Sequence, residues 1–415
     1  MRPYDHLADF EAIRSLALLN ADAAAAQLAL QSHLQTNTIV RVYYGPPGTG
    51  KTLQAVRDAV LTVDPGFADG ADFSACFRRM NELHQRVSFI TFHPSLQYED
   101  VVESIRPRLS SETADEGDEE PTKQAELRYM HYQGPIMRLA NEALKSPHLQ
   151  FAIIIDEINR GDVSRILGPL LSAIEPDKRA GGEYPIGFER QYPERTDIDS
   201  RAFLPANLHV FGTMNSADRN IALVDYALRR RFEFVACPPE AHLLGATEGE
   251  EQIDMRKLLA VLNDRIAYLL DDDHRIGHSY FMRLKSASDL LRVFAERILP
   301  LLFEYFYGNE QLVALVLGDR PDGTPNVLSM SRGSDFKKLF GLAIEEAAGL
   351  GAATRPHVSV QVDRRFWNAE KLPAGPDDAA YAFAALRKVY APATASAEAE
   401  APVPAASDDD VAASQ

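Results

Sequence analysis

The chain has 415 residues, of which 46% are hydrophobic and 25% charged, and this balance excludes a largely disordered chain and a coiled-coil rod. Its 60 acidic and 43 basic residues give a net charge of −17, which excludes a uniformly basic nucleic-acid binder. There is no apolar run of the roughly 20 residues that a membrane helix needs, no visible secretory signal and no cysteine framework, so we expect a cytoplasmic protein.

Helical and strand-like patterns alternate along the first half of the chain, after a helical segment over residues 1–38. The predicted strands are residues 38–44, 87–92, 150–155, 207–213 and 232–236. The predicted helices are residues 52–63, 124–144, 163–174 and 223–231. A solvated acidic loop is expected over 110–122, and a hairpin or loop insertion over 181–201. Strands that alternate with helices predict a parallel, doubly wound sheet with helices on both faces.

The second half of the chain reads mainly as helices, over residues 255–270, 287–307 and 335–348, with a strand over 357–367. From about Pro392 the composition is rich in Ala, Glu, Pro, Ser and Asp, and we expect no fixed structure there. The predicted domains are therefore a short helical segment (1–38), an α/β core (39–236), a helical domain (237–390) and a tail (391–415).

The sequence GPPGTGKT, between a predicted strand and a predicted helix, has the spacing of a phosphate-binding loop. Its glycines let the backbone N–H groups surround phosphate oxygens, and the following helix adds its positive end. The lysine is expected to bridge the β- and γ-phosphates, and the threonine hydroxyl to bind Mg²⁺. The candidate nucleotide-binding residues are Gly45, Pro46, Pro47, Gly48, Thr49, Gly50, Lys51, Thr52 and Asp156.

Polar residues end two later strands, and arginines lie near the end of one short predicted helix. FAIIIDE is a buried strand that ends in Asp156, a candidate Mg²⁺ ligand together with Thr52, and Glu157, a candidate to polarise the attacking water. VFGTMN ends in Asn215, which we expect beside Glu157. DYALRRRF places Arg230 and Arg231 where a guanidinium could reach the γ-phosphate, often of a neighbouring subunit.

Together these motifs resemble those of the AAA+ NTPases and, more narrowly, those of the McrB-like GTPases of modified-cytosine restriction systems. The segments that carry the narrower resemblance are Thr91–Pro107, Ile154–Arg179, Gly212–Phe232, Ile276–Phe281 and Leu301–Asn309. The resemblance implies an α/β fold, a three-layer αβα P-loop NTPase core followed by a mainly helical lid.

The resemblance also implies a ring, expected to be hexameric, with nucleotide at the subunit interfaces. One subunit would supply Glu157 and Asn215, and its neighbour Arg230 or Arg231, with Arg160 as a further interface candidate. The implied substrate is GTP, or else ATP, with Mg²⁺ as cofactor. The implied partners are a McrC-like nuclease and, through the complex, DNA.

Alternatives stay open at this stage. An ATP-dependent remodelling chaperone, similar to the MoxR and dynein-related groups, fits the phosphate loop equally well. A nucleotide-gated scaffold with little turnover is less compatible with an intact Glu157 and Asn215. About 40 residues precede the phosphate loop, too few for the modified-DNA-reading domain of the family, so we do not expect that activity to carry over. His278, in the lid, is either a nucleotide sensor or a capping or core residue.

Overall fold

The computed structural model describes residues 38–67, 72–110, 126–190, 201–218, 229–319, 326–332, 358–363, 366 and 376–391. These residues belong to two compact units. The first comprises Met1–Leu244 and Asn263–Arg283, and the second comprises Gly245–Leu262 and Leu284–Gln415. The predicted segment 1–38, acidic loop, tail, and helices over 223–231 and 335–348 lie wholly or largely outside the described residues.

A parallel sheet forms the middle layer of the first unit. Its described strands are β1 (Val40–Gly45), β2 (Val87–Thr91), β5 (Phe151–Asp156), β8 (Leu208–Asn215) and β9 (Glu233–Ala236). They lie in the order β2–β5–β8–β1–β9, and every pairing is parallel. This confirms the predicted strands and the doubly wound sheet. Because the strands are parallel, all their carboxyl ends lie along one edge of the sheet, where ligands of such folds bind.

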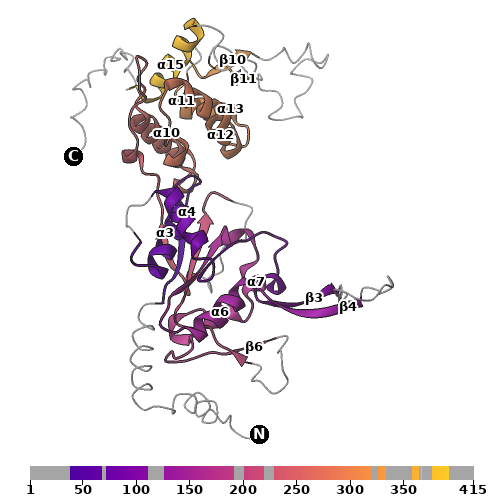
Figure 1. The fold of residues 1–415 in the computed structure, drawn as a ribbon. Coiled ribbons are helices and arrows are strands. Elements are labelled where there is room, and N and C mark those ends of the chain that lie inside the picture. Colours follow the sequence, from indigo (N-terminus) through magenta and orange to yellow (C-terminus); the bar gives the residue numbers. More distant parts are fainter. Residues whose placement is uncertain are drawn as a thin grey trace, which may run out of the picture. The chain divides into compact units, whose positions relative to one another are not determined.

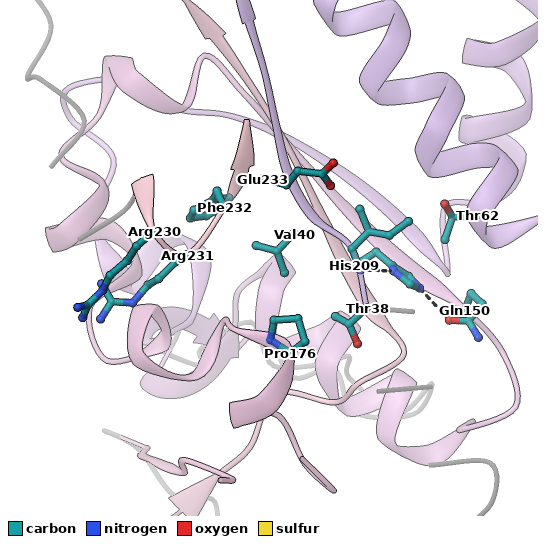
Figure 2. Close-up of a pocket in the computed structure, with 11 residues that line it drawn as sticks. Thr38, Val40, Thr62, Gln150, Pro176, His209, Arg230, Arg231, Phe232 and Glu233 are labelled. Carbon is teal, nitrogen blue, oxygen red and sulfur yellow. Dashed lines mark hydrogen bonds between the residues drawn. The ribbon is translucent and has the colours of Figure 1, made fainter. Parts of the chain in front are cut away.

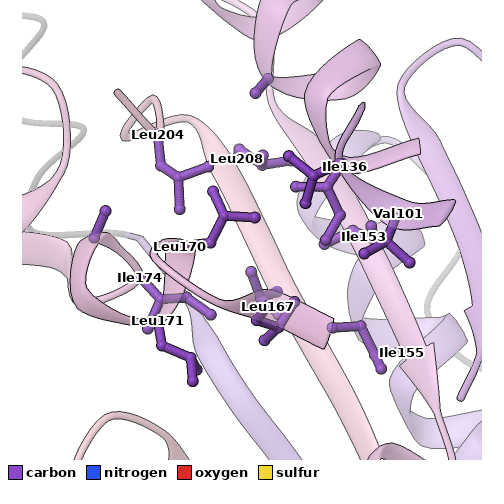
Figure 3. Close-up of a cluster of buried hydrophobic side chains, with 14 of the residues drawn as sticks. Val101, Ile136, Ile153, Ile155, Leu167, Leu170, Leu171, Ile174, Leu204 and Leu208 are labelled. Atoms are coloured by element: carbon purple, nitrogen blue, oxygen red, sulfur yellow. The ribbon is translucent and has the colours of Figure 1, made fainter. Parts of the chain in front are cut away.

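Helices cover both faces of this sheet. Ile153 and Ile155 of β5 lie in one buried cluster with α6 (Pro135–Lys145), α7 (Val163–Leu167) and α8 (Leu170–Ala173), which Figure 3 shows. Ala152 and Ile154 alternate with them and lie in a second cluster with α3 (Lys51–Val63) and α4 (Phe73–Glu82). The fully apolar run of β5 is thus explained by burial on both faces.

Two predicted helices are wrong in part. Residues 124–144 are not one helix, because Glu126–Gln133 forms strand β4, paired antiparallel with β3 (Glu103–Ser110), and α6 begins only at Pro135. Proline is favoured in the first turn of a helix and ends a continuous one before it. Residues 163–174 form α7 and α8 rather than one helix, since Pro169 disfavours a helical residue before it.

In the first unit, helices α4 and α5 (Tyr98–Val101) and strand β3 have no counterpart in the predictions. The β3–β4 hairpin projects from the sheet of the first unit (Figure 1). In the segment expected as a hairpin or loop insertion (181–201), β6 (Phe188–Glu189) pairs antiparallel with β7 (Arg201–Ala202).

The second unit is mainly helical. Helix α10 (Met255–Leu269) is divided between the two units. The other helices described in the second unit are α11 (Ala287–Val293), a π-helical turn (Phe294–Ile298), α12 (Leu299–Tyr305), α13 (Glu310–Leu317) and α15 (Pro376–Tyr390). β11 (Val358–Val362), expected within 357–367, pairs antiparallel with β10 (Leu328–Arg332). Among the described residues, no helix combines the length and the apolar character needed to cross a membrane.

Candidate nucleotide-binding site

The phosphate loop joins β1 to α3. Gly48 and Gly50 have φ angles of 78° and 84°, in the left-handed region that glycine adopts without strain. Gly50 is also the N-cap of α3, and no side chain makes a capping hydrogen bond to the first turn of this helix. The N-terminal N–H groups of the helix therefore remain oriented towards the loop, where an anion is stabilised by these groups and by the helix dipole.

Lys51 is buried, with 8% of its surface exposed. Its Nζ donates hydrogen bonds to the carbonyl oxygens of Gly45 (3.0 Å) and Pro46 (2.7 Å) and to Oδ1 of Asn215 (2.9 Å). Burial lowers the pKa of Lys51, and the charges of Glu157 and Asp156 oppose this shift. The ammonium group is thus fixed between the phosphate loop and the carboxyl end of β8.

Asp156 ends β5 and is held by two hydroxyl groups. Its Oδ1 accepts hydrogen bonds from Thr52 Oγ1 (3.0 Å) and from Thr213 Oγ1 (2.7 Å). Thr213 Oγ1 also accepts a hydrogen bond from the N–H of Glu157 (3.0 Å). Thr213 was not predicted as a site residue. Its signal in the sequence is its place two residues before Asn215, which points it to the same side of β8.

Glu157 has a left-handed backbone, with φ 54° and ψ 47°. A non-glycine residue in this conformation is uncommon, and such strain is concentrated at functional sites. Burial raises the pKa of the Glu157 carboxyl, whereas the nearby Arg160 lowers it. Oε2 of Glu157 is buried and has no hydrogen-bond partner among the described residues, and Arg160 Nε lies 3.5 Å from it. This oxygen is therefore available to a polar group of a substrate or a water.

A second layer of contacts fixes the residues around Glu157. Arg160 Nη2 lies 3.4 Å from Asp218 Oδ2, which links the segment after β5 to the segment after β8. Asn159 Nδ2 donates a hydrogen bond to the carbonyl oxygen of Asn215 (3.0 Å). Neither Asn159 nor Asp218 was predicted to act in the site, although both belong to the motifs EINR and NSAD.

The oxygen atoms around Asp156 suit Mg²⁺. This ion prefers oxygen ligands and is usually bound by one or two carboxylates together with substrate phosphates and water. The hydroxyl of Thr52 donates a hydrogen bond to the carboxylate of Asp156 beside the phosphate loop, so these two groups are candidate ligands for the ion. In the part of the chain that the structure describes, no cluster of three or more His, Cys, Asp or Glu side chains could hold a metal on its own.

The predicted arginines lie elsewhere. Arg230 and Arg231 precede β9, whose Glu233 pairs with Arg41 at the amino end of β1, whereas the phosphate loop follows Gly45 at the carboxyl end. Four residues of strand, about 13 Å, separate these levels. Both arginines line a cavity of about 650 Å³ at this opposite edge (Figure 2). Neither arginine is brought to the phosphate loop of its own subunit.

The two arginines differ in their surroundings. Arg230 is exposed, whereas Arg231 is half-buried and its Nε lies 3.1 Å from Oε1 of Glu175.

The lid residue His278 is buried at 6% exposure, and its Nδ1 accepts a hydrogen bond from the N–H of Glu240 (3.0 Å). Burial lowers the pKa of His278, so its neutral form fits this core position.

Two family models match the chain. The AAA domain of the dynein-related subfamily matches residues 42–232, which include the phosphate loop, Asp156, Glu157, Asn215 and both arginines. The alpha-helical lid domain of McrB matches residues 254–314. These two matches agree with the α/β core and the helical lid that the structure contains.

Two curated relatives are similar over much of the chain. One is the Type IV methyl-directed restriction enzyme EcoKMcrB subunit of Escherichia coli K12, 29% identical over 67% of this chain and 57% of its own length. The other is the Type II restriction enzyme BsuMI component YdiS of Bacillus subtilis 168, 28% identical over 47% of this chain and 55% of its own length. The chain thus spans little more than half the length of these relatives. A solved structure, NtrX of Brucella abortus, matches 71% of this chain and 65% of its own at 11% identity and a TM-score of 0.26.

Proposed function

This chain is a McrB-like AAA+ protein, and on that premise we propose that it hydrolyses a nucleoside triphosphate at the carboxyl ends of β1, β5 and β8. The observation that carries the proposal is one set of direct hydrogen bonds. Lys51 bonds to Asn215, and Thr52 and Thr213 bond to Asp156. A structural role alone would not require an ammonium, a hydroxyl, a carboxylate and an amide at one edge of a sheet beside a phosphate loop.

The chain's own residues have distinct roles in this proposal. The amides of the loop and of the first turn of α3 bind phosphate oxygens, and Lys51 neutralises charge on the β- and γ-phosphates. Glu157 accepts a hydrogen bond from the attacking water and polarises it, because its Oε2 lacks another hydrogen-bond partner among the described residues. Asn215, held by Asn159 and Lys51, orients that water or the γ-phosphate.

Mg²⁺ is the proposed cofactor, with Thr52 and Asp156 as its protein ligands. When bound, it would neutralise negative charge on the β- and γ-phosphates. Thr213 acts through Asp156. Its hydroxyl donates to Asp156 and accepts from the N–H of Glu157, so it fixes the relative position of the two acids.

We further propose that the site is completed by a neighbouring subunit in a ring, which we expect to be hexameric. Arg230 and Arg231 lie at the opposite edge of the sheet from the loop of their own chain, so they can contribute to phosphoryl transfer only in another chain. Guanidinium groups supplied in this way contribute large factors to turnover. Arg160, half exposed next to Glu157, is a further candidate for this interface.

Both curated relatives are components of restriction enzymes, which supports a role in a DNA restriction complex rather than in protein remodelling. We propose that the ring uses GTP in preference to ATP, that a McrC-like nuclease subunit is its partner, and that it acts on DNA through that complex. The motif residues contact phosphates and Mg²⁺ rather than the base, so the preference for GTP rests on the resemblance alone.

The experiment that tests the proposed function is phosphate release from the full chain with Mg²⁺, with GTP and ATP compared over a range of protein concentrations. The proposal predicts turnover with GTP whose rate per subunit rises with protein concentration. The Glu157→Gln variant is the control for contaminating phosphatases. Preference for ATP would favour the remodelling function, and nucleotide binding without turnover at any concentration would favour a scaffold.

A further inference from the structure

A segment from the lid region, Ile276–Tyr280, is packed directly on the phosphate loop within the first unit. The N–H of Gly277 donates a hydrogen bond to the carbonyl oxygen of Pro47 (3.1 Å), and the N–H of Ser279 donates one to the carbonyl oxygen of Gly48 (3.0 Å). The approach is so close that a Cβ atom on Gly277 would lie 2.0 Å from the carbonyl carbon of Gly48. Only glycine is compatible with this packing.

These two hydrogen bonds orient the amides that face a phosphate. In a planar trans peptide the C=O and the N–H point in opposite directions. When Gly277 holds the carbonyl of Pro47 on one side, the N–H of Gly48 points to the other side. The carbonyl of Gly48, held by Ser279, orients the N–H of Thr49 in the same way.

The preceding peptides of the loop cannot take this role. The peptide units that follow Gly45 and Pro46 lead into prolines and have no N–H to offer. Their carbonyls are instead held by Lys51 Nζ. The N–H groups of Gly48 and Thr49 are therefore the first amides of the loop that can bind a phosphate, and the Ile276–Tyr280 segment contacts both of their peptide units.

One buried side chain holds this segment in place. Asn263, on α10 and 5% exposed, donates from Nδ2 to the carbonyl oxygen of Ile276 (2.9 Å) and accepts at Oδ1 from the N–H of Ile276 (2.6 Å). This pair of bonds fixes the residue immediately before Gly277 at both of its backbone polar groups. His278 adds a second attachment through the N–H of Glu240.

We propose that Asn263 is a positioning residue for nucleotide binding, and that it acts through Ile276 and Gly277 to orient the N–H groups of Gly48 and Thr49 towards the phosphates. The proposal rests on the proposed function, since it concerns the same phosphate site. It assigns to the lid region a role in shaping the loop itself, independent of any contact with the base.

The test is equilibrium binding of a fluorescent GTP or ATP analogue to the full chain with Mg²⁺, with inorganic tripolyphosphate as competitor. We expect Asn263→Ala to weaken binding of the analogue and of tripolyphosphate by the same factor, at least about tenfold. The reason is that the N–H groups of Gly48 and Thr49 would lose their hydrogen bonds to the charged phosphate. KM should rise by a similar factor, with a smaller change in kcat.

Asn207→Ala is the matched control. Asn207 is a buried asparagine of the same unit, 3% exposed, whose Nδ2 donates to the carbonyl oxygens of Ala143, Ser146 and Leu149, away from the loop. It should lower Tm as Asn263→Ala does but leave both affinities unchanged. If Asn263→Ala binds both probes as the wild type does, or weakens the nucleotide analogue alone, the proposal is wrong. If the wild type binds neither probe, the proposed function itself fails.

A second pair of variants does not depend on Asn263. Gly277→Ala introduces a methyl group against the backbone of Gly48, whereas at Gly245 a Cβ meets no atom within 4 Å. We expect Gly277→Ala to weaken both probes at least about tenfold and Gly245→Ala to change neither. Unchanged affinities in a folded Gly277→Ala variant would contradict the proposal.

Discussion

Lys51 Nζ donates a 2.9 Å hydrogen bond to Oδ1 of Asn215, although 164 residues separate them in the chain. The sheet explains this contact. β1 and β8 are neighbours, and the register pairs Gly45, at the start of the phosphate loop, with Asn215, at the end of β8. The relationship joins the residue expected to bind phosphate to the residue expected to act beside the attacking water.

Removing the buried ammonium tests the phosphate site. Lys51→Ala should weaken nucleotide binding by roughly 10- to 100-fold, since hydrogen bonds to charged groups are worth about 1.5–3 kcal/mol. Titration with a fluorescent nucleotide measures this. Lys145→Ala is the control, because that lysine is exposed on α6 and pairs only locally with Glu142. Equal affinities for wild type and Lys51→Ala would remove Lys51 from the site.

An isosteric substitution can separate the role of Glu157 in turnover from any effect on nucleotide binding. Glu157→Gln keeps the shape of the side chain but cannot act as a base, so nucleotide affinity should stay close to that of the wild type. Turnover should fall by roughly 10²- to 10⁴-fold, the usual contribution of general acid–base catalysis. Phosphate release together with nucleotide titration measures both. Glu142→Gln, an exposed change on α6, should alter neither, and full turnover in Glu157→Gln would refute the assigned role.

The fall of kcat/KM at low pH, the acid limb of the pH profile, should report the protonation of the Glu157 carboxylate. Burial raises the pKa of this carboxyl, and the carboxylate is the active form, so kcat/KM should fall with decreasing pH at a higher pH than for an ordinary glutamate. The charge of Arg160 lowers this pKa, so Arg160→Ala should move the limb to still higher pH. Arg165→Ala, an exposed change on α7, should not move it. A limb that is identical in wild type and Arg160→Ala would argue against this assignment.

A buried histidine away from the site should make stability depend on pH. His209 Nδ1 accepts a hydrogen bond from the N–H of Ile39 (3.0 Å), and its other ring nitrogen lies 2.8 Å from Oε1 of Gln150 (Figure 2). Burial, with a smaller effect of the charge of Arg179, lowers the pKa of His209 to about 4. The neutral ring is therefore the form that the fold accommodates.

The direction of this pH dependence follows from proton uptake by the unfolded chain. Below the ordinary histidine pKa of about 6.5 the unfolded chain binds a proton that the folded chain does not, so the free energy of unfolding falls as the pH drops from about 6.5 to about 4. The loss from this residue should reach about 3 kcal/mol at the acid end. Denaturant unfolding across this range measures it. In His209→Gln this part of the pH dependence should disappear, and an unchanged slope would contradict the assignment.

The sequence allowed us to predict the parts of the site that lie within one short motif. It did not allow us to predict contacts that depend on the turns between elements. The spacing in GPPGTGKT and FAIIIDE predicts a phosphate site, and the parallel sheet brings Lys51 to Asn215 and Thr52 to Asp156. The β3–β4 hairpin was missed because the apolar residues near Tyr129 and Tyr132 fit a helical period as well as a strand, and only Gly134 and Pro135 mark the boundary.

Site residues that act through the backbone were also missed. Thr213 bridges Asp156 and the N–H of Glu157, and Asn263 holds both backbone groups of Ile276. Such roles depend on where a side chain meets a distant main-chain group, and no spacing in the sequence reports that. The positions of Arg230 and Arg231 at the far edge of the sheet likewise emerge only once the register of β9 with β1 is known.

Mixing two inactive variants tests most directly whether the catalytic site is shared between subunits. Lys51→Ala retains Arg230 but lacks a working phosphate loop, and Arg230→Ala retains the loop but lacks the exposed arginine. Arg230→Ala alone should release phosphate at a rate about 10³-fold below the wild type, the lower range for such an arginine. Lys51→Ala alone should also turn over slowly, because it binds nucleotide weakly. Arg231→Ala is mixed in parallel.

Equal amounts of the two variants should recover a clear fraction of wild-type turnover, because some interfaces then pair an intact loop with an intact arginine. The recovery should increase with total protein concentration. A mixture that never exceeds the sum of its two components, while both variants remain folded and assembled, would contradict the shared site.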